Sequence, residues 1–178
     1  MKKEISKMYG YAVGKIVFSL VLAVVAYGVI FCSDTEIEVF GKIVCSLCWG
    51  IACGVYFISG VSTIINGTRQ VKTYMENTTY NECRLDEEYK NAGNYGRIRV
   101  GERHVFANAS NGFFVIPYAD IETAFTRSHK YAYAYIKAKC LPKRIKMYYL
   151  NRRKAGEAVQ SILWKTKQVS DAENETSF

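Results

Sequence analysis

Charged residues are missing from two long stretches of the sequence. Residues 16–33 form a run of 18 uncharged positions, and residues 43–68 form a run of 26. About 20 mainly apolar helical residues span the hydrocarbon core of a bilayer, so each run is long enough to cross it. Ionisable groups inside a membrane usually mark transport or proton paths. Their absence from both runs argues against a transporter or an ion pump.

Two other interpretations of these runs are weaker. Lys2 and Lys3 precede the first run, as in a signal peptide, but the run is long for that role and no small-x-small cleavage site follows it. Two buried core helices would need a large apolar remainder, whereas the rest of the chain is short and polar. We therefore predict a transmembrane helical hairpin, with the lipid bilayer as its first partner.

Histidines are scarce, and no catalytic pattern accompanies them. His104 falls in a predicted strand and His129 in a polar connection, and we expect both to be solvated surface residues. No Ser-His-Asp, metal-ligand or P-loop pattern is present. The expectation is a protein with no enzymatic activity, no metal and no cofactor.

The six cysteines form no clear metal or disulfide pattern. Cys45 and Cys48 make a C-x-x-C pair inside the second run, next to Cys53, without a second pair or a nearby histidine. Zinc is therefore a weak interpretation, and small apolar residues in a membrane helix are the better one. Cys83 and Cys140 are expected to be free thiols in a reducing cytoplasm.

Basic residues flank the predicted hairpin on both sides. Lys2, Lys3, Lys7 and Lys15 precede it, Arg69 and Lys72 follow it, and the connecting loop is mostly acidic. Cytoplasmic segments carry the excess of lysine and arginine. The sequence therefore predicts a multi-pass protein of the cell membrane with both termini in the cytoplasm.

Small residues recur every four positions in the second run, at Ser46, Gly50 and Gly54, and Ser19 and Ala23 do so in the first run. Small residues at this spacing let two helix backbones approach closely in lipid. They could join the hairpin to itself or to a second copy, and the pattern does not choose.

The rest of the chain is basic, and after the connector its apolar residues recur with the period of two that is typical of strands. After residue 67 there are 19 Lys and Arg against 12 Asp and Glu, a net charge of +7. Residues 69–92 indicate a helical connector. Extended segments are predicted at 97–100 or 103–108, at 113–125, at 129–139 and at 144–150. Asn111-Gly112 predicts a tight turn that needs positive φ. Pro117 predicts an edge strand or a bulge.

The last predicted element is an amphipathic helix. Ala155, Ala158, Val159, Ile162 and Leu163 repeat at three and four positions, which places them on one helix face. Asn151 is the expected N-cap, and the acidic tail is expected to be disordered. The fold class is α+β: a helical hairpin, then a small antiparallel sheet closed by a C-terminal helix.

Strands closed by one C-terminal helix are the outline of a pleckstrin-homology-like (PH-like) domain. The segment "GERHVFANASNGFFVIPYADIETAF", residues 101–125, resembles bacterial PH-like domains, in which a hairpin and an apolar strand run into an Asp-Ile pair, here Asp120-Ile121. Together with two spans, the chain looks like a group of small bacterial membrane proteins with a C-terminal PH-like domain. The resemblance covers about residues 95–168. It implies an adaptor or sensing module without a catalytic residue.

These arguments divide the chain into consecutive segments. They are a cytoplasmic N-terminus 1–14, a first span 15–33, an external loop 34–42, a second span 43–67, a helical connector 68–94, a cytoplasmic PH-like domain 95–168 and a disordered tail 169–178.

Residues 131–140 alternate strictly in an extended chain. Ala132, Ala134, Ile136, Ala138 and Cys140 fall on one side, which we expect to be buried. Tyrosines and lysines fall on the other side, at 131, 133, 135, 137 and 139, and the two faces could be reversed at the tyrosine end, since tyrosine is often buried. Cross-strand aromatic pairs stabilise a sheet by themselves, so a purely structural role for the tyrosines is a strong alternative to binding.

The functional hypothesis is a surface for anionic lipid headgroups or for an acidic protein partner. Cations near an anionic membrane contribute about 1 kcal/mol each, and a helix N-terminus with free N–H groups favours phosphate. Nucleic acid could use the same residue types, but the membrane tether makes it the weaker choice. The predicted surface contains Lys137, Lys139, Lys143, Arg144, Lys146, Arg152, Arg153 and Lys154.

The leading hypothesis is a non-enzymatic membrane protein whose cytoplasmic module binds, scaffolds or regulates at the inner membrane surface. The alternative is a small transport or channel subunit, or an accessory protein, in which the hairpin acts by forming a homo-oligomer.

Overall fold

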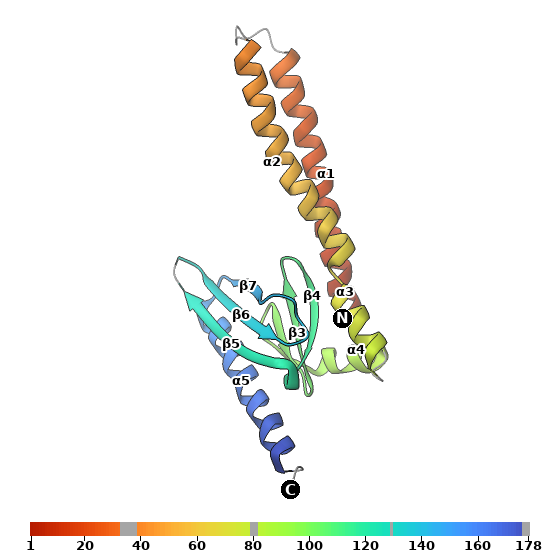
Figure 1. Ribbon diagram of the computed structural model, residues 1–178, viewed down its shortest axis with the longest axis vertical. Coiled ribbons are helices and arrows are strands. Elements are labelled where there is room, and N and C mark those ends of the chain that lie inside the picture. The colour runs from red at the N-terminus through yellow and green to blue at the C-terminus, as the bar shows by residue number, and fades with distance from the viewer. Residues whose placement is uncertain (33–38, 79–81, 129, 176–178) are drawn as a thin grey trace. The chain divides into compact units, whose positions relative to one another are not determined.

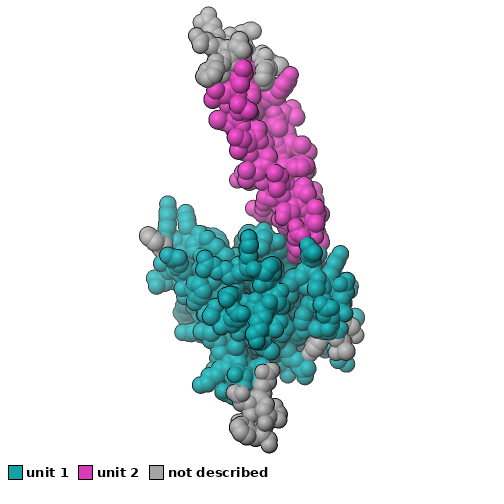
Figure 2. Space-filling model, in the orientation of Figure 1, with its two compact units in different colours: residues 1–5, 68–178 teal, residues 6–67 magenta. Residues whose placement is uncertain are grey.

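A computed structural model describes residues 1–32, 39–78, 82–128 and 130–175. The chain forms two compact units (Figure 2). One contains residues 6–67. The other contains residues 1–5 and 68–178, and it holds all of the β structure.

The first unit is a helical hairpin. Helix α1 extends over Lys2–Cys32 and helix α2 over Val39–Asn66 (Figure 1). Both are long and apolar enough to span a membrane. Only 6% of the most apolar 18-residue segment of each helix is buried. Helix α1 includes residues 2–14 of the segment 1–14 that we predicted to precede the span. Of the predicted loop 34–42, residues 34–38 lie outside the described residues and the remainder belongs to α2.

The two helices approach closely at Gly60, and of the predicted small residues Ser19 is buried, with 2% exposed. A Cβ added at Gly60 would lie 2.7 Å from Ile16 Cγ1 and 2.9 Å from the Ala12 carbonyl oxygen. At Gly50 and Gly54 an added Cβ would meet nothing within 4 Å. Ser46 and Gly50 instead line an apolar gap of about 150 Å³ inside the hairpin. Within one chain, Gly50 and Gly54 therefore do not bring backbones together.

The predicted helical connector consists of two helices, α3 over Arg69–Asn77 and α4 over Glu82–Asn91. Each buries apolar side chains against the second unit, Val71 from α3 and Leu85 and Tyr89 from α4. The side chain of Gln70 donates to the Val115 carbonyl oxygen at 2.7 Å and accepts from the Val115 N–H at 2.9 Å. Helix α3 is thus hydrogen-bonded directly to a strand.

The first sheet has the order β1-β2-β3-β4, with all neighbours antiparallel. The strands are β1 Gly93–Asn94, β2 Ile98–Val100, β3 His104–Ala109 and β4 Gly112–Pro117. The β3–β4 hairpin forms at the predicted turn, but Asn111 does not take the predicted positive φ, since Gly96 is the one described residue that does. As predicted for Pro117, β4 is an edge strand.

The second sheet has the order β5-β6-β7, with β5 Ile121–Ser128, β6 Ala132–Ala138 and β7 Ile145–Tyr149. The prediction of one extended segment over 113–125 is therefore wrong. A 3-10 turn at Tyr118–Asp120 separates β4 from β5 and moves the chain to another sheet. Two features favour the break: Pro117 has no N–H to donate to a ladder, and the buried Tyr118 hydroxyl donates to the Gly101 carbonyl oxygen at 3.0 Å.

Helix α5, Arg152–Glu175, packs on both sheets and closes the core (Figure 1). Asn151 is its N-cap, as predicted, because its side-chain oxygen accepts from the N–H of Arg153 at 2.9 Å. The helix continues past residue 168, so residues 169–175 of the predicted disordered tail are helical. Val169 packs against the core, and no glycine or proline follows to end the helix. Residues 176–178 of that tail lie outside the described residues.

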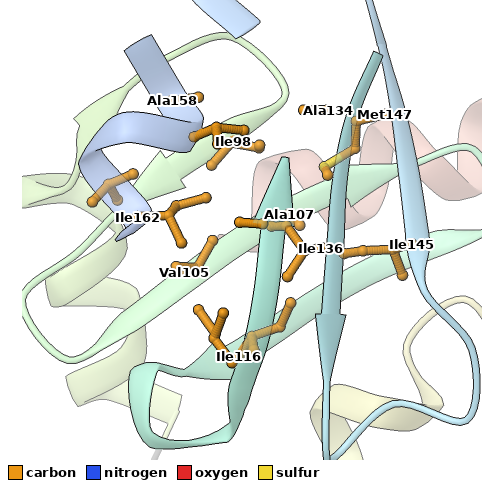
Figure 3. Close-up of a cluster of buried hydrophobic side chains, with 14 of the residues drawn as sticks. Ile98, Val105, Ala107, Ile116, Ala134, Ile136, Ile145, Met147, Ala158 and Ile162 are labelled. Carbon is orange, nitrogen blue, oxygen red and sulfur yellow. The ribbon is translucent and has the colours of Figure 1, made fainter. Parts of the chain in front are cut away.

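One apolar core joins the two sheets and α5 (Figure 3). It contains small and branched side chains that are at most 3% exposed. The labelled members are Ile98, Val105, Ala107 and Ile116 from the first sheet, Ala134, Ile136, Ile145 and Met147 from the second sheet, and Ala158 and Ile162 from α5.

Candidate functional site

The alternation predicted for residues 131–140 is confirmed in part. Ala132, Ala134, Ile136 and Ala138 are buried, while Tyr131, Lys137 and Lys139 are exposed on the opposite side. On that side Tyr133 is half-buried and Tyr135 is only 9% exposed, so the predicted solvent exposure is wrong for Tyr135, which Phe125 and Arg144 cover. The same division continues in β7, where Ile145, Met147 and Tyr149 point to the core. One face of the second sheet therefore packs against the core, and the other is its outer face.

The outer face is a continuous row of aromatic rings. Phe125 and Tyr135, which are paired in the β5–β6 register, stack with ring centroids 5.0 Å apart. Tyr133 and Tyr148, paired in the β6–β7 register, lie 5.7 Å apart, and the Tyr131 ring meets the edge of Tyr148 at 5.4 Å. Each ring is thus held by another ring across a strand boundary.

Cations lie over these rings. The Lys146 ammonium is 3.9 Å from the centroid of Tyr133, and the Arg144 guanidinium is 5.3 Å from that of Tyr135. A cation over an aromatic face is favourable by about 0.5–1 kcal/mol at an exposed site. We call this surface the aromatic–basic face: Phe125, Tyr131, Tyr133, Tyr135, Lys137, Arg144, Lys146 and Tyr148.

The remaining predicted cations near this face differ in their pairing. The Lys137 ammonium is 2.6 Å from Glu122 Oε2, an exposed ion pair that contributes little to stability. Lys139 and Lys143 are exposed in the connection between β6 and β7. Five of the eight predicted residues, Lys137, Lys139, Lys143, Arg144 and Lys146, therefore belong to one end and one side of the second sheet.

The other three predicted cations form a separate group. Arg152, Arg153 and Lys154 are exposed in the first turn of α5, beyond the other end of β7 from Arg144. Five strand residues at about 3.3 Å each separate the two groups by roughly 17 Å. Asn151 already accepts from the N–H groups of Arg153 and Lys154, at 2.9 and 3.4 Å. The phosphate site predicted at this helix end therefore lacks two of its free donors.

The structure also brings together residues that the sequence did not indicate. His104 is 2% exposed, so the prediction of a solvated surface residue is wrong. Its Nδ1 is 2.7 Å from Glu88 Oε2 and its Nε2 is 2.6 Å from the Tyr74 hydroxyl. Glu88 Oε1 accepts from the N–H groups of Arg103 and His104 at 2.7 and 2.9 Å. His129 lies outside the described residues.

This Tyr74–His104–Glu88 cluster has the buried His104 at its centre and joins three elements, α3, β3 and α4. Burial raises the pKa of Glu88, but the hydrogen bonds from His104 and from the backbone N–H of Arg103 outweigh that effect. The net result is a pKa below its ordinary value. Glu88 is therefore held as a carboxylate, and it also lines a polar cleft of about 610 Å³. The cations and carboxylates of the cleft are evenly mixed: Arg84, Arg103 and Lys165 with Glu87, Glu88 and Glu102.

The structure does not group residues into a metal centre in the part of the chain that it describes, where no three His, Cys, Asp or Glu side chains could share an ion. The described cysteines are unbridged. Burial and, to a smaller degree, the neighbouring Asp120 raise the pKa of Cys140 to about 12.

No family model matches the chain, and neither a curated protein nor a solved structure matches it.

Proposed function

We propose that this chain is a non-enzymatic membrane protein with a PH-like binding module at the inner membrane surface. The single observation that carries the proposal is the aromatic–basic face. It is a row of rings on the outer face of the second sheet, with exposed side chains at Phe125, Tyr131, Arg144 and Lys146, in a chain whose two apolar helices are each long enough to cross a bilayer.

The arrangement of the second unit supports a PH-like module. Its described residues form a four-stranded and a three-stranded antiparallel sheet, packed around one core and closed by a C-terminal helix. This is the number of strands of a full PH-like domain. The sequence alone indicated only four extended segments, because β1 and β2 have two and three residues and because residues 113–125, predicted as one segment, contain parts of both β4 and β5.

The ligand class follows from charge. The exposed cations of the second sheet face an anionic leaflet, where each contributes about 1 kcal/mol within a Debye length of the surface. The basic residues that flank the hairpin favour a cytoplasmic location for both termini. Anionic lipid headgroups or an acidic segment of a protein partner would satisfy the same charges.

The test compares full-length protein in nanodiscs of phosphatidylcholine with nanodiscs that also contain phosphatidylglycerol. We expect slower amide exchange over residues 131–149 in the anionic discs, and loss of this difference at high salt. The variant K143E/K146E should lose the protection, whereas K72E/K167E, which removes the same charge from α3 and α5, should keep it. Equal exchange in both kinds of disc would remove the lipid version of the proposal.

A second candidate, an oligomeric transport or channel subunit or accessory protein, rests on Gly54. Gly54 is not among the residues that line the gap inside the hairpin, and a Cβ added there would meet nothing within 4 Å, which leaves room for a helix of a second copy. Crosslinking in native membranes separates the two functions. A discrete homo-oligomer, abolished by Gly54→Ile, would favour the second candidate, and crosslinks to a different protein would favour the first.

A further inference from the structure

Leu150 is more exposed than any other large apolar side chain that the structure describes. It follows β7 directly, and its exposed fraction is 92%. The last β6–β7 pair is Ala132 with Tyr149, both buried. Tyr131 and Leu150 are the next residues beyond this pair, and the Tyr131 ring contacts Tyr148 of the outer face. Leu150 lines a cavity together with Tyr148, so it lies beside the end of the row of aromatic rings.

Aromatic rings lie close to Leu150. The Tyr131 ring contacts the Tyr148 ring at 5.4 Å, and Tyr148 and Leu150 line the same open cavity of about 370 Å³. Tyrosine combines an apolar ring with a polar hydroxyl, which suits it to the boundary between hydrocarbon and water. A single exposed leucine is ordinary, but here it stands beside rings of the interfacial type.

Several cations lie near Leu150. Arg97 and Lys154 line the cavity together with Leu150, and Lys130 lies 5.8 Å from the centroid of the Tyr131 ring. Arg152 follows Leu150 by two residues, and the first turn of α5 contains no acidic residue. We call this region the Leu150 corner: Arg97, Lys130, Tyr131, Tyr148, Leu150, Arg152 and Lys154.

An exposed leucine with tyrosines and cations nearby has the side-chain types that the successive layers of an anionic membrane favour. Leucine enters the acyl boundary, tyrosines remain at the headgroup level, and lysine and arginine reach the phosphates from above. An acidic protein surface would satisfy the cations but would leave Leu150 in a polar environment. The combination therefore favours a lipid surface.

We propose that the Leu150 corner docks on the anionic bilayer surface, with Leu150 inserted below the phosphates and Arg97, Lys130 and Lys154 bound to phosphate oxygens. This inference rests on the proposed function and assigns its membrane contact to a specific place. Each cation removed weakens docking about fivefold. Replacing Leu150 by Asp weakens it about tenfold or more.

The test uses full-length protein with one tryptophan. Trp49 and Trp164 are 46% and 61% exposed, and Phe keeps an aromatic ring at each position. A tryptophan is then introduced by Leu150→Trp and its quenching by brominated acyl chains is measured in neutral and anionic nanodiscs. The control carries only the native Trp164, which is exposed on α5. We expect strong quenching and a blue shift at position 150 in anionic discs alone, reversed by R97E/K154E, and no quenching at Trp164.

Two results overturn the inference in different ways. If the tryptophan at 150 stays unquenched while residues 131–149 still gain exchange protection in anionic discs, the Leu150 corner is not the contact but the proposed function stands. If neither signal appears, an acidic protein partner replaces lipid as the ligand of the aromatic–basic face, and the inference fails with the lipid version of that function.

Discussion

At the scale of single residues, the cluster of Tyr74, Glu88 and the buried His104 makes stability depend on pH. The pKa of Glu88 in the folded protein lies below its ordinary value of 4.5. A group with a depressed folded pKa stabilises the fold above its unfolded pKa, and that contribution disappears as the pH falls through the folded pKa. We expect the urea midpoint of the full chain in detergent to fall as the pH is lowered below about 4.5.

The variant Glu88→Gln isolates this effect. It removes charge-assisted hydrogen bonds to a side chain that is 2% exposed, so we expect a loss of about 1–3 kcal/mol at pH 7 and a flatter pH dependence. Glu87→Gln is the control, because Glu87 is an exposed neighbour on the same helix. An equal pH dependence in wild type and Glu88→Gln would assign the acid sensitivity to other carboxylates.

Cys140 is expected to be unreactive. Its pKa of about 12, raised by burial and by Asp120, leaves almost no thiolate at neutral pH, and the thiolate is the nucleophile. In the folded protein, N-ethylmaleimide should modify the exposed Cys83 well before Cys140, as followed by peptide mass mapping. Comparable rates at the two cysteines would contradict this, and denaturation with urea should make the rates equal.

Local pattern predicted the residues of β6 but not the environment of His104. The alternation over 131–140 is a property of one strand, so the core side and the outer side could be assigned from the sequence. The burial of Tyr135 on the outer side could not, because it depends on Phe125 and Arg144 from the neighbouring chain segments. The partners of His104 lie 30 and 16 residues away, on two helices, and nothing in the local sequence pairs them with it. The same reason explains the division of the predicted basic surface, because the length of β7 separates its two halves.

At the scale of elements, Gln70 closes the edge of the first sheet. Its amide takes both backbone groups of Val115 in the edge strand β4, as a neighbouring strand would. Gln70→Ala leaves a buried donor and acceptor without these partners, so we expect a loss of about 1–3 kcal/mol in the free energy of unfolding, measured by urea titration. Edge strands with free backbone groups recruit other chains, so this variant should also aggregate faster.

Thr73→Ala is the matched control for Gln70, because Thr73 is exposed on the same helix. Gln70→Glu should fall between wild type and Gln70→Ala, since a carboxylate can accept from the Val115 N–H but cannot donate to its carbonyl. Identical midpoints for all variants would mean that water replaces the amide without cost.

In the helical hairpin, Gly60 is the position at which we expect an added methyl group to be destabilising. A methyl group at Gly60 would meet the Ala12 backbone oxygen at 2.9 Å and Ile16 at 2.7 Å, and a backbone atom cannot rotate away. We expect Gly60→Ala to destabilise the hairpin by about 1–3 kcal/mol, seen as a lower thermal midpoint in detergent. Gly54→Ala should leave the midpoint unchanged, because its methyl group would contact nothing within 4 Å. A fall for Gly54→Ala alone would indicate packing against a second copy.

The elements themselves were predictable to different degrees. Both long helices and α5 follow from apolar runs and from a repeat of three and four. The division of the strands between two sheets was not predictable, because it depends on the short turn at Tyr118–Asp120, which the buried Tyr118 stabilises through Gly101. The continuation of α5 beyond 168 depends on the contact of Val169 with the core.

At the scale of the whole molecule, the proposed topology is testable through Cys83. This thiol is exposed on α4, in the same unit as the sheets. A membrane-impermeant maleimide should label it in inverted vesicles and not in intact cells, with Cys83→Ser identifying the labelled position. Labelling of Cys83 in intact cells would place the β unit outside and would remove the cytoplasmic module from the proposal.

The aromatic–basic face is already organised before anything touches it. Tyr133 is held between Tyr148 and the ammonium of Lys146, and Tyr135 between Phe125 and the guanidinium of Arg144. Ordering a flexible side chain on association costs about 0.5–1.5 kcal/mol. Much of that rotamer freedom is already lost in the unliganded fold. A ligand that fits these rings should therefore bind with a small entropic penalty, and loosening one tyrosine should weaken binding mainly through faster dissociation.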